Sequence, residues 1–216
     1  MEYEMKYLLM IAMFLTLALQ AQTAAPPALG DGSVGDPYQI ATLNNLYWIE
    51  QNSNVWDDNF IQTANINAAS TSSWNGGEGW HSIGYSGTPF TGTYDGSGYS
   101  IISLTCSYPE YSGEYVGLFG YVGTGAEIKN INLVGGSLSA NDKIGGLAGL
   151  VYEATVTNCH SSVNITGGGT AGGLIGWSQL STITSCSATG TVWGWSNLGG
   201  LIGYSWHDTL VSNCYA

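Results

Sequence analysis

Residues 145–149 read Gly145-Gly146-Leu147-Ala148-Gly149, and this short glycine-leucine core returns at three other places in the chain. The related copies occupy residues 116–120, 172–176 and 199–203, and the central leucines follow one another at intervals of 29, 27 and 27 residues. A period this regular indicates stacked copies of one structural unit and not a single globular core. The repeat therefore predicts the architecture, and it moves the expected function away from catalysis.

A second pattern lies downstream of each core at a nearly constant distance. It reads Ile-Lys-Asn-Ile, Val-Thr-Asn-Cys, Ile-Thr-Ser-Cys and Val-Ser-Asn-Cys, at residues 128–131, 156–159, 183–186 and 211–214. Composition alone does not produce two patterns in phase across several copies. We therefore interpret residues 116–216 as a true internal repeat.

The make-up of each unit favours strands over helices. The units are rich in Gly, Ser, Thr, Val and Ile. Glycine destabilises helix interiors and β-branched residues favour strands. A leucine-rich repeat needs a denser leucine pattern than one leucine per core. A β-solenoid, in which coils of short strands stack about 4.8 Å apart, fits these units best.

Stacked coils place equivalent side chains in columns along the axis. The paired glycines are expected at corners with positive φ and at points where coils approach closely. The Asn of the second pattern is expected either to bond backbone groups at a turn or to stack on the Asn of the next coil. We predict three inward columns, formed by Leu118, Leu147, Leu174 and Leu201, by Ile131, Cys159, Cys186 and Cys214, and by Ile128, Val156, Ile183 and Val211.

These residues resemble the GLUG motif, which is named for its Gly-Leu-x-Gly core and occurs in bacterial secreted and surface proteins. The first copy departs from the pattern, with a single glycine before Leu118 and Ile131 in place of Cys. Residues 90–101 look like the opening coil of a pectin-lyase-like β-helix. The resemblance implies an all-β, right-handed parallel β-helix with coils of 27–29 residues. The structural core of the repeats consists of Gly117, Leu118, Gly120, Gly146, Leu147, Gly149, Gly173, Leu174, Gly176, Gly200, Leu201 and Gly203.

The chain divides into three parts. Residues 7–21 are apolar and are followed by small and polar residues, which predicts a signal peptide over residues 1–25. Residues 26–89 are expected to form a capping segment. Residues 90–216 carry the GLUG-type repeats and stop inside a unit, so we expect a repeat region truncated at its C-terminus and a longer parent polypeptide.

Three elements are predicted within the capping segment. Residues 38–40 and 60–66 have the composition of strands, and residues 43–51 carry apolar side chains suited to a short helix. Thr42 is expected to cap the first turn of that helix. The helix is expected to cover the open N-terminal end of the solenoid.

Charge limits the range of partners. The chain of 216 residues has three lysines, no arginine and fifteen acidic residues, for a formal net charge of −12. A chain with this net negative charge is expected to bind nucleic acids, anionic membranes and polyanionic glycans poorly, because all of these are negatively charged. We expect no nucleic acid partner and no membrane insertion after the signal peptide is cleaved.

The candidate chemistry is sparse. Asp57 and Asp58 are the one adjacent acidic pair in the sequence, and they precede the repeats. No Cys or His spacing suggests zinc. We therefore expect no enzyme activity, no cofactor and no metal. Cys159, Cys186 and Cys214 are interpreted as free buried thiols, with a Cys186–Cys214 or Cys159–Cys186 disulfide as the alternative.

Aromatic residues near the repeat cores are the candidate binding residues. Rings spaced by coil height would present a platform to sugar rings or to another protein. The alternative is a stacking ladder that stabilises the coils. The candidate residues are Tyr121, Trp177, Trp193, Trp195, Tyr204 and Trp206.

These inferences combine into one functional hypothesis. The sequence predicts a non-enzymatic, secreted or cell-surface β-helix that acts as an adhesin-like stalk or spacer. The alternative is a carbohydrate-binding module of a larger secreted enzyme. Extracellular glycans or surface proteins are the expected partners in both cases.

Overall fold

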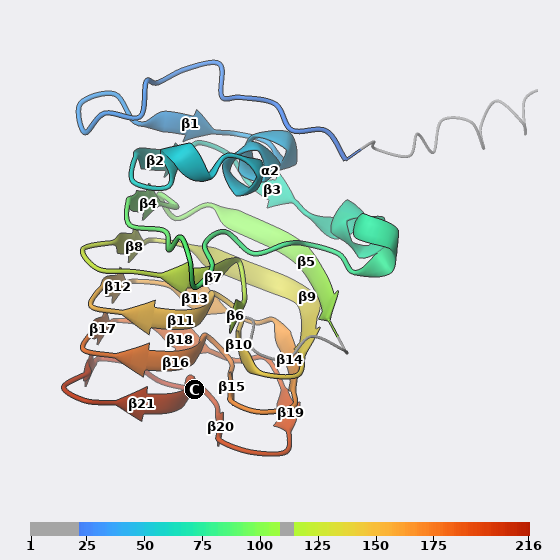
Figure 1. The fold of residues 1–216 in the computed structure, drawn as a ribbon, viewed down its shortest axis with the longest axis vertical. Helices are drawn as coiled ribbons and strands as arrows, with labels where there is room; N and C mark the ends of the chain where they lie inside the picture. Colours follow the sequence, from blue (N-terminus) through green and yellow to red (C-terminus); the bar gives the residue numbers. More distant parts are fainter. Residues whose placement is uncertain (1–21, 109–114) are drawn as a thin grey trace, which may run out of the picture.

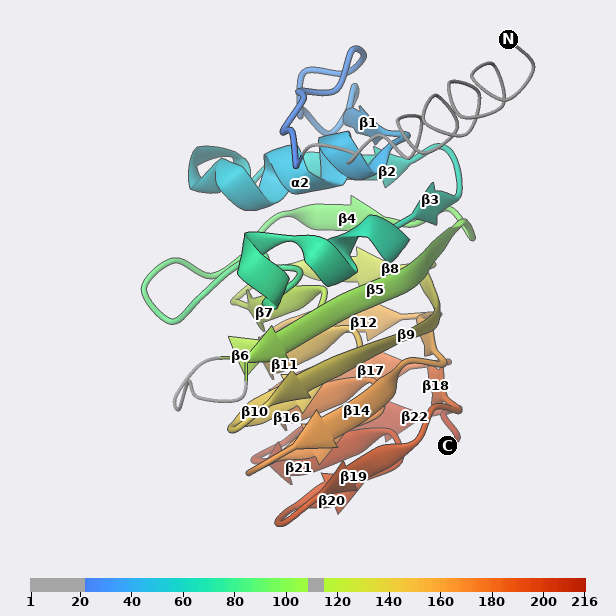
Figure 2. The same ribbon diagram turned by 90° about the vertical axis from the view of Figure 1, so that its right-hand side faces the viewer.

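The computed structural model describes residues 22–108 and 115–216. The predicted signal peptide, residues 1–25, lies outside these ranges apart from its last four residues. The chain winds into parallel coils that stack along one axis, as Figures 1 and 2 show from two sides. The predicted β-solenoid is thus confirmed. Within the described ranges, no helix has the length and apolar character needed to cross a bilayer.

The longest sheet runs through the whole stack. Its seven strands pair in parallel, from residue 38 to residue 212, and continue without a break across residue 90. Residues of the capping segment therefore share a sheet with the repeats. The strands, in order, are β1 (Tyr38–Ile40), β2 (Asn59–Gln62), β4 (Thr93–Asp95), β8 (Glu127–Lys129), β12 (Thr155–Thr157), β17 (Thr182–Thr184) and β22 (Leu210–Ser212).

A second sheet changes from long strands to pairs of short ones. The strand β9 pairs with β5 along most of its length and with two separate strands, β13 and β14, in the next coil. The sheet consists of β3 (Ile66–Asn67), β5 (Ser100–Tyr108), β9 (Asn132–Ala140), β13 (His160–Ser161), β14 (Asn164–Gly167), β18 (Ser187–Ala188) and β19 (Val192–Gly194).

The glycine-leucine cores form two further parallel sheets. Each core leucine lies between a strand of one sheet and a strand of the other, with its side chain inside the solenoid. The first sheet contains β6 (Tyr115–Val116), β10 (Lys143–Gly145), β15 (Ala171–Gly172) and β20 (Leu198–Gly199). The second contains β7 (Phe119–Val122), β11 (Ala148–Tyr152), β16 (Ile175–Gln179) and β21 (Ile202–Trp206).

The predicted inward columns are present. Leu118, Leu147 and Leu174 are fully buried, and Leu201 in the last coil is half-buried. Ile128, Val156, Ile183 and Val211 are paired directly from strand to strand. Exposure rises in the last coil, because no further coil of the described chain covers it: Ile183 is 0% exposed, whereas Val211 is 43% exposed.

The cysteine column is present as well, and its thiols are free. Cys159 and Cys186 are buried and Cys214 is half-buried. The backbone N–H of Cys159 donates to Cys186 Sγ at 3.4 Å, and that of Cys186 donates to Cys214 Sγ at 3.3 Å. Each thiol therefore links two coils without a covalent bond.

The positive-φ corners lie at different residues from those expected. None of the paired glycines at 145–146, 172–173 and 199–200 has a positive φ, so that part of the prediction is wrong. The corners fall instead on the Asn position of the second pattern, where Asn130, Asn158, Ser185 and Asn213 have φ of 57°, 52°, 55° and 54°. Asn tolerates this conformation because its short polar side chain bonds locally.

The paired glycines allow neighbouring coils to approach closely, which was also expected. A Cβ atom on Gly172 would collide with the carbonyl oxygen of Ile175 and would come within 2.6 Å of the Gly203 nitrogen. Gly145 would place its Cβ 2.6 Å from the Gly176 nitrogen. Any larger residue at these positions would push neighbouring coils apart.

The helix α2 (Leu43–Gln51) has the predicted bounds. Thr42 Oγ1 accepts a hydrogen bond from the Asn45 backbone N–H at 3.2 Å, and the Thr42 N–H donates to Asn45 Oδ1 at 3.1 Å. Its apolar face, with Leu46 and Ile49 fully buried, joins the core. Figures 1 and 2 place α2 at the N-terminal end of the stack.

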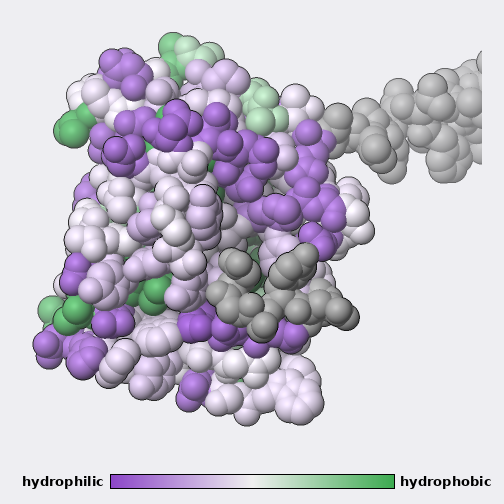
Figure 3. All heavy atoms as spheres, viewed as in Figure 1, coloured by the Kyte–Doolittle hydropathy of each residue, from purple (hydrophilic) through white to green (hydrophobic). Residues whose placement is uncertain are grey.

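The remaining N-terminal elements are short. The predicted strand over 60–66 is two strands, β2 and β3, because a corner separates them. Three 3-10 helices flank these strands: η1 (Ser53–Val55) precedes β2, and η2 (Ala69–Ser73) and η3 (Asn75–Gly77) follow β3. The face in Figure 3 is mostly of intermediate hydropathy, with hydrophilic patches and a few apolar spots, which fits a chain with only 8% charged residues.

Candidate binding sites

One line of outward side chains runs along the sheet that contains β7, β11, β16 and β21. Strand pairing places Tyr121, Leu150, Trp177 and Tyr204 directly beside one another in successive coils. Three of the four are aromatic, and Leu150 interrupts the line and is 7% exposed. The register thus brings Trp177 and Tyr204 together but separates them from Tyr121.

Trp177 is the centre of an aromatic cluster at the C-terminal coils. Its ring lies 5.6 Å from the Tyr204 ring and 6.1 Å from the Trp206 ring. Trp206 also stacks on His207, with centroids 4.3 Å apart. We call Trp177, Tyr204 and Trp206 the Trp177 cluster. Tyr204 and Trp206 are 40% and 46% exposed, so the cluster presents rings to solvent.

A lysine packs against this cluster. Lys143 Nζ lies 5.4 Å from the Trp177 ring centroid and 5.3 Å from that of Tyr115, and it pairs with Asp142 at 2.9 Å. The lysine therefore bridges two aromatic rings from different coils. Trp177 Nε1 is buried without a hydrogen-bond partner in the described chain.

The other predicted aromatic residues lie elsewhere. Trp193 and Trp195 form their own pair, with centroids 6.3 Å apart and exposures of 61% and 81%. Trp193 belongs to β19, in a different sheet from the Trp177 cluster. Tyr121 packs against Tyr115 at 5.5 Å. The six predicted residues therefore form three separate groups and not one platform.

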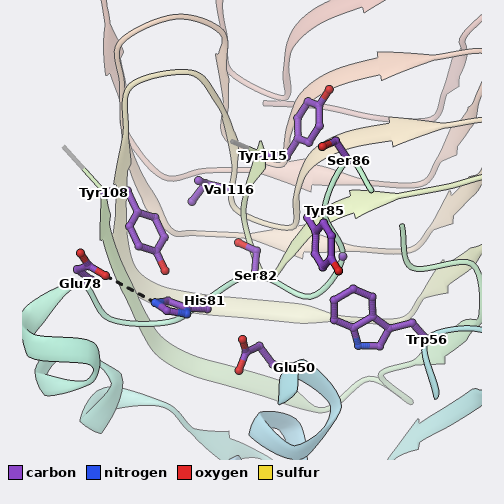
Figure 4. Close-up of a pocket in the computed structure, with 11 residues that line it drawn as sticks. Glu50, Trp56, Glu78, His81, Ser82, Tyr85, Ser86, Tyr108, Tyr115 and Val116 are labelled. Carbon is purple, nitrogen blue, oxygen red and sulfur yellow. Dashed lines mark ion pairs between the residues drawn. The ribbon is translucent and has the colours of Figure 1, made fainter. Parts of the chain in front are cut away.

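A cavity near the N-terminal coils was not predicted. It measures about 460 Å³, a volume typical of small-molecule sites. Its polar groups include Glu50, Glu78 and His81, and its walls include four aromatic rings, as Figure 4 shows. The rings belong to Trp56, Tyr85, Tyr108 and Tyr115. We call this cavity the Glu50 pocket.

Segments distant in the sequence build the Glu50 pocket. Glu50 comes from the last turn of α2, Tyr108 from the end of β5 and Tyr115 from β6. Glu78, His81 and Tyr85 come from the connection between η3 and β4. The pocket lacks a contiguous motif, and the only local signal is the density of aromatic residues between residues 74 and 85.

The polar groups of the pocket are weakly paired. Burial raises the pKa of Glu50 to about 7, and a hydrogen bond from Gln51 Nε2, 2.6 Å long, offsets part of that rise. His81 Nε2 lies 3.7 Å from Glu78 Oε2, beyond hydrogen-bond distance, and has no hydrogen-bond partner in the described chain. Within the same ranges, no group of three or more His, Cys, Asp or Glu residues is arranged to hold a metal ion.

Comparison with known proteins identifies the repeat. The family model of the GLUG motif matches residues 141–166 and 167–192. Residues 141–192 are therefore two GLUG repeats, and they lie within the stacked coils of the β-solenoid. The coils on either side of the matched residues keep the same register, so the structural repeat extends beyond the match.

Two relatives match the chain over part of its length. The chain is 33% identical to Halomucin of Haloquadratum walsbyi over 137 residues, which are 59% of this chain and 2% of that protein. It is 28% identical over 127 residues to a "Putative Gly-rich membrane protein" of Evansella cellulosilytica, covering 57% of this chain and 14% of the relative. The chain therefore spans only a small part of both relatives.

A solved structure was also found. It is the crystal structure of a "putative immunoglobulin A1 protease from Bacteroides ovatus", with 18% sequence identity and a TM-score of 0.49. The similarity covers 87% of this chain and 77% of that chain.

Proposed function

We propose that this protein is a non-enzymatic, secreted or cell-surface β-helix that acts as an adhesin-like stalk or spacer. The observation that carries the proposal is the seven-stranded parallel sheet, which runs in unbroken register from β1 to β22. Six steps between neighbouring strands give a length of about 29 Å. Because each coil is hydrogen-bonded to the next, the stack behaves as a stiff rod that holds its ends at a fixed separation.

The relatives support a location at the cell surface. One of them bears the name of a membrane protein, and both are several times longer than this chain. A solenoid of repeats is well suited to be one section of a long surface polypeptide. The secretory signal predicted within residues 1–25 agrees with export.

The acidic groups of the repeats support a structural role. Glu153 lies at a corner with φ of 51°, and its carboxylate accepts a hydrogen bond from Thr124 Oγ1 at 2.8 Å in the preceding coil. Glu127 pairs with Lys129 at 3.1 Å on the same strand. These carboxylates connect neighbouring residues and coils, which favours a scaffold over a pair of hydrolytic carboxylates.

A second candidate function rests on the Trp177 cluster. Exposed aromatic rings spaced along a rigid surface are suited to stacking on sugar rings. The cluster favours a carbohydrate-binding module of a larger secreted enzyme, with an extracellular glycan as the partner. This function would use the same scaffold.

Two measurements test these proposals. Antibody labelling of intact producing cells should detect the chain outside the cell, and labelling only after lysis would contradict the surface location. A glycan array probed with the full chain separates the two functions. Silence across the array supports the spacer, whereas glycan binding that is lost in Trp206→Ala supports the binding module.

A further inference from the structure

The Glu50 pocket contains a carboxyl group that lacks a positively charged partner. Glu50 points into the cavity from the last turn of α2 (Figure 4), and its hydrogen bond comes from the neutral amide of Gln51. The two lysines of the described chain are paired elsewhere, Lys129 with Glu127 and Lys143 with Asp142. A half-buried carboxylate without a cation is unfavourable, because its lost hydration is not replaced.

The walls of the pocket are suited to a cation. Trp56 and Tyr85 meet edge to face, with centroids 5.7 Å apart, and Tyr108 packs on His81 at 5.6 Å. The faces of such rings carry negative potential and attract ammonium groups. Tyr85 is 47% exposed, so it lies at the opening and is accessible to a ligand.

The chain already shows that one of these rings accepts an ammonium group. Tyr115 lines the pocket, and Lys143 Nζ lies 5.3 Å from its ring centroid. Lys143 itself does not line the cavity. Trp56 and Tyr85 offer the same ring chemistry to a ligand that enters beside Glu50.

We propose that the Glu50 pocket binds an organic ammonium cation, with Glu50 as its counter-ion and Trp56, Tyr85 and Tyr115 as its aromatic walls. The amino group of an amino sugar and a quaternary alkylammonium share this chemistry. The formal net charge of −12 adds a general attraction for cations. The site is distinct from the Trp177 cluster, although Lys143 contacts both Tyr115 and Trp177, and it does not depend on the stalk or spacer function.

Binding is expected to strengthen as the pH rises. Because burial raises the pKa of Glu50 to about 7, the carboxylate forms between about pH 6 and about pH 8. The groups that face it are Glu78 and His81 across the cavity, Tyr85, Tyr108 and Tyr115 in the walls, and Tyr47 on its own helix.

Calorimetric titration of the full chain with three probes tests the proposal. Choline carries a permanent charge, glucosamine carries an amine on a sugar ring, and glucose is the neutral control. We expect choline or glucosamine to bind at about pH 7.5 and glucose to bind at least about tenfold more weakly. Binding of glucosamine without choline would identify the amino sugar as the source of the ammonium group. Glucose binding as tight as glucosamine binding, or no binding of either cation, would overturn the proposal.

Variants test the roles of single residues. Glu50→Gln keeps the shape of the side chain and should weaken choline binding about tenfold, whereas Glu127→Gln removes the same charge from a distant strand and should leave binding unchanged. Tyr85→Phe should bind like the wild type and Tyr85→Ala should bind more weakly, because the ring contacts the ligand and the hydroxyl does not. Far-ultraviolet circular dichroism confirms the fold of each variant. A folded Glu50→Gln variant that binds choline like the wild type would overturn the assignment.

Discussion

Asn158 donates a hydrogen bond from Nδ2 to the side-chain oxygen of Asn130, 2.8 Å away in the preceding coil. Asn130 in turn donates to Asp95 Oδ1 at 2.9 Å, so a ladder of side chains runs across three coils. Both Asn residues also have positive φ. One residue type thus turns the backbone at the corner and ties the corner to its neighbour.

Substitution of Asn158 separates these two roles. We expect Asn158→Ala to lower the free energy of unfolding by about 2 kcal/mol, because it loses the ladder hydrogen bond and places an alanine at positive φ. Asn158→Gly loses only the hydrogen bond, since glycine adopts positive φ freely, and should be about 1 kcal/mol more stable than Asn158→Ala. Denaturant titration measures both values. Equal stability of the two variants would show that the corner imposes no backbone strain.

The paired glycines give a sharper test of coil contact. Gly172→Ala should lower the free energy of unfolding by about 3 kcal/mol, because its Cβ meets backbone atoms of Ile175 and Gly203 that cannot move independently. Gly35→Ala is the matched control, since nothing lies within 4 Å of a Cβ at that position. Thermal unfolding followed by circular dichroism compares the two. A Gly172→Ala variant as stable as the control would contradict the close packing of the coils.

The sequence predicted the repeat region well because its signals recur. One leucine every 27 or 29 residues indicates a column, and residues such as Leu147 and Leu174 lie in it as expected. The helix over 43–51 was also predicted, because Thr42 and the apolar spacing are local signals. Periodic and local patterns can be interpreted without knowledge of distant contacts.

Other features depend on contacts that a single sequence does not reveal. The corner conformation falls on Asn158 and not on the paired glycines, because glycine both permits positive φ and allows close packing, and the sequence does not indicate which property is used. The Glu50 pocket joins α2 with residues 78–85, 108 and 115. The strand register that brings these segments together appears in no local pattern.

The cysteine column predicts a specific pattern of thiol reactivity. Cys214 is half-buried in the last coil, whereas Cys106 and Cys159 are buried, and burial raises the pKa of both thiols. The pKa of Cys186 is lowered by its hydrogen bond to Cys159, but its sulfur is shielded from reagents. Burial raises the pKa of Cys214 as well, so its advantage is access to solvent. We expect Cys214 to react with an aromatic disulfide reagent in the native state faster than the three buried thiols.

Two controls complete the thiol experiment. Cys214→Ser should abolish the rapid phase, and the denatured wild type should titrate four thiols without prior reduction. Two thiols in place of four after denaturation would mean that a disulfide joins two cysteines of the column, contrary to the free thiols of the structure.

The pocket carboxyl predicts how stability changes with pH. The folded chain holds the Glu50 proton up to about pH 7, whereas the unfolded chain releases it near the ordinary glutamate value. The folded state therefore binds more protons between these values, and the contribution of Glu50 to stability falls as the pH rises through them. Glu50→Gln keeps the neutral form at every pH, so its melting temperature should exceed that of the wild type more at about pH 8 than at about pH 5. For Glu127→Gln, the melting temperature relative to the wild type should not rise in this way between about pH 5 and about pH 8. An equal rise in both variants would assign the effect to net charge.

Substitutions in the Trp177 cluster are expected to affect glycan binding and stability to different degrees. If the cluster binds a glycan, Trp206→Ala should weaken binding about tenfold and lower the melting temperature less than Trp177→Ala does, because Trp206 is 46% exposed. Trp177→Ala should lower both the affinity for the glycan and the melting temperature, since Trp177 also packs against Lys143 and Tyr204. Trp195→Ala is the matched control, because that ring is 81% exposed and lies in the separate pair with Trp193. Glycan binding by calorimetry and unfolding by circular dichroism measure the two effects. Equal loss of binding in Trp195→Ala and Trp206→Ala would mean that the aromatic rings act through general surface hydrophobicity, and the cluster would then be a stacking ladder for the coils and not a site.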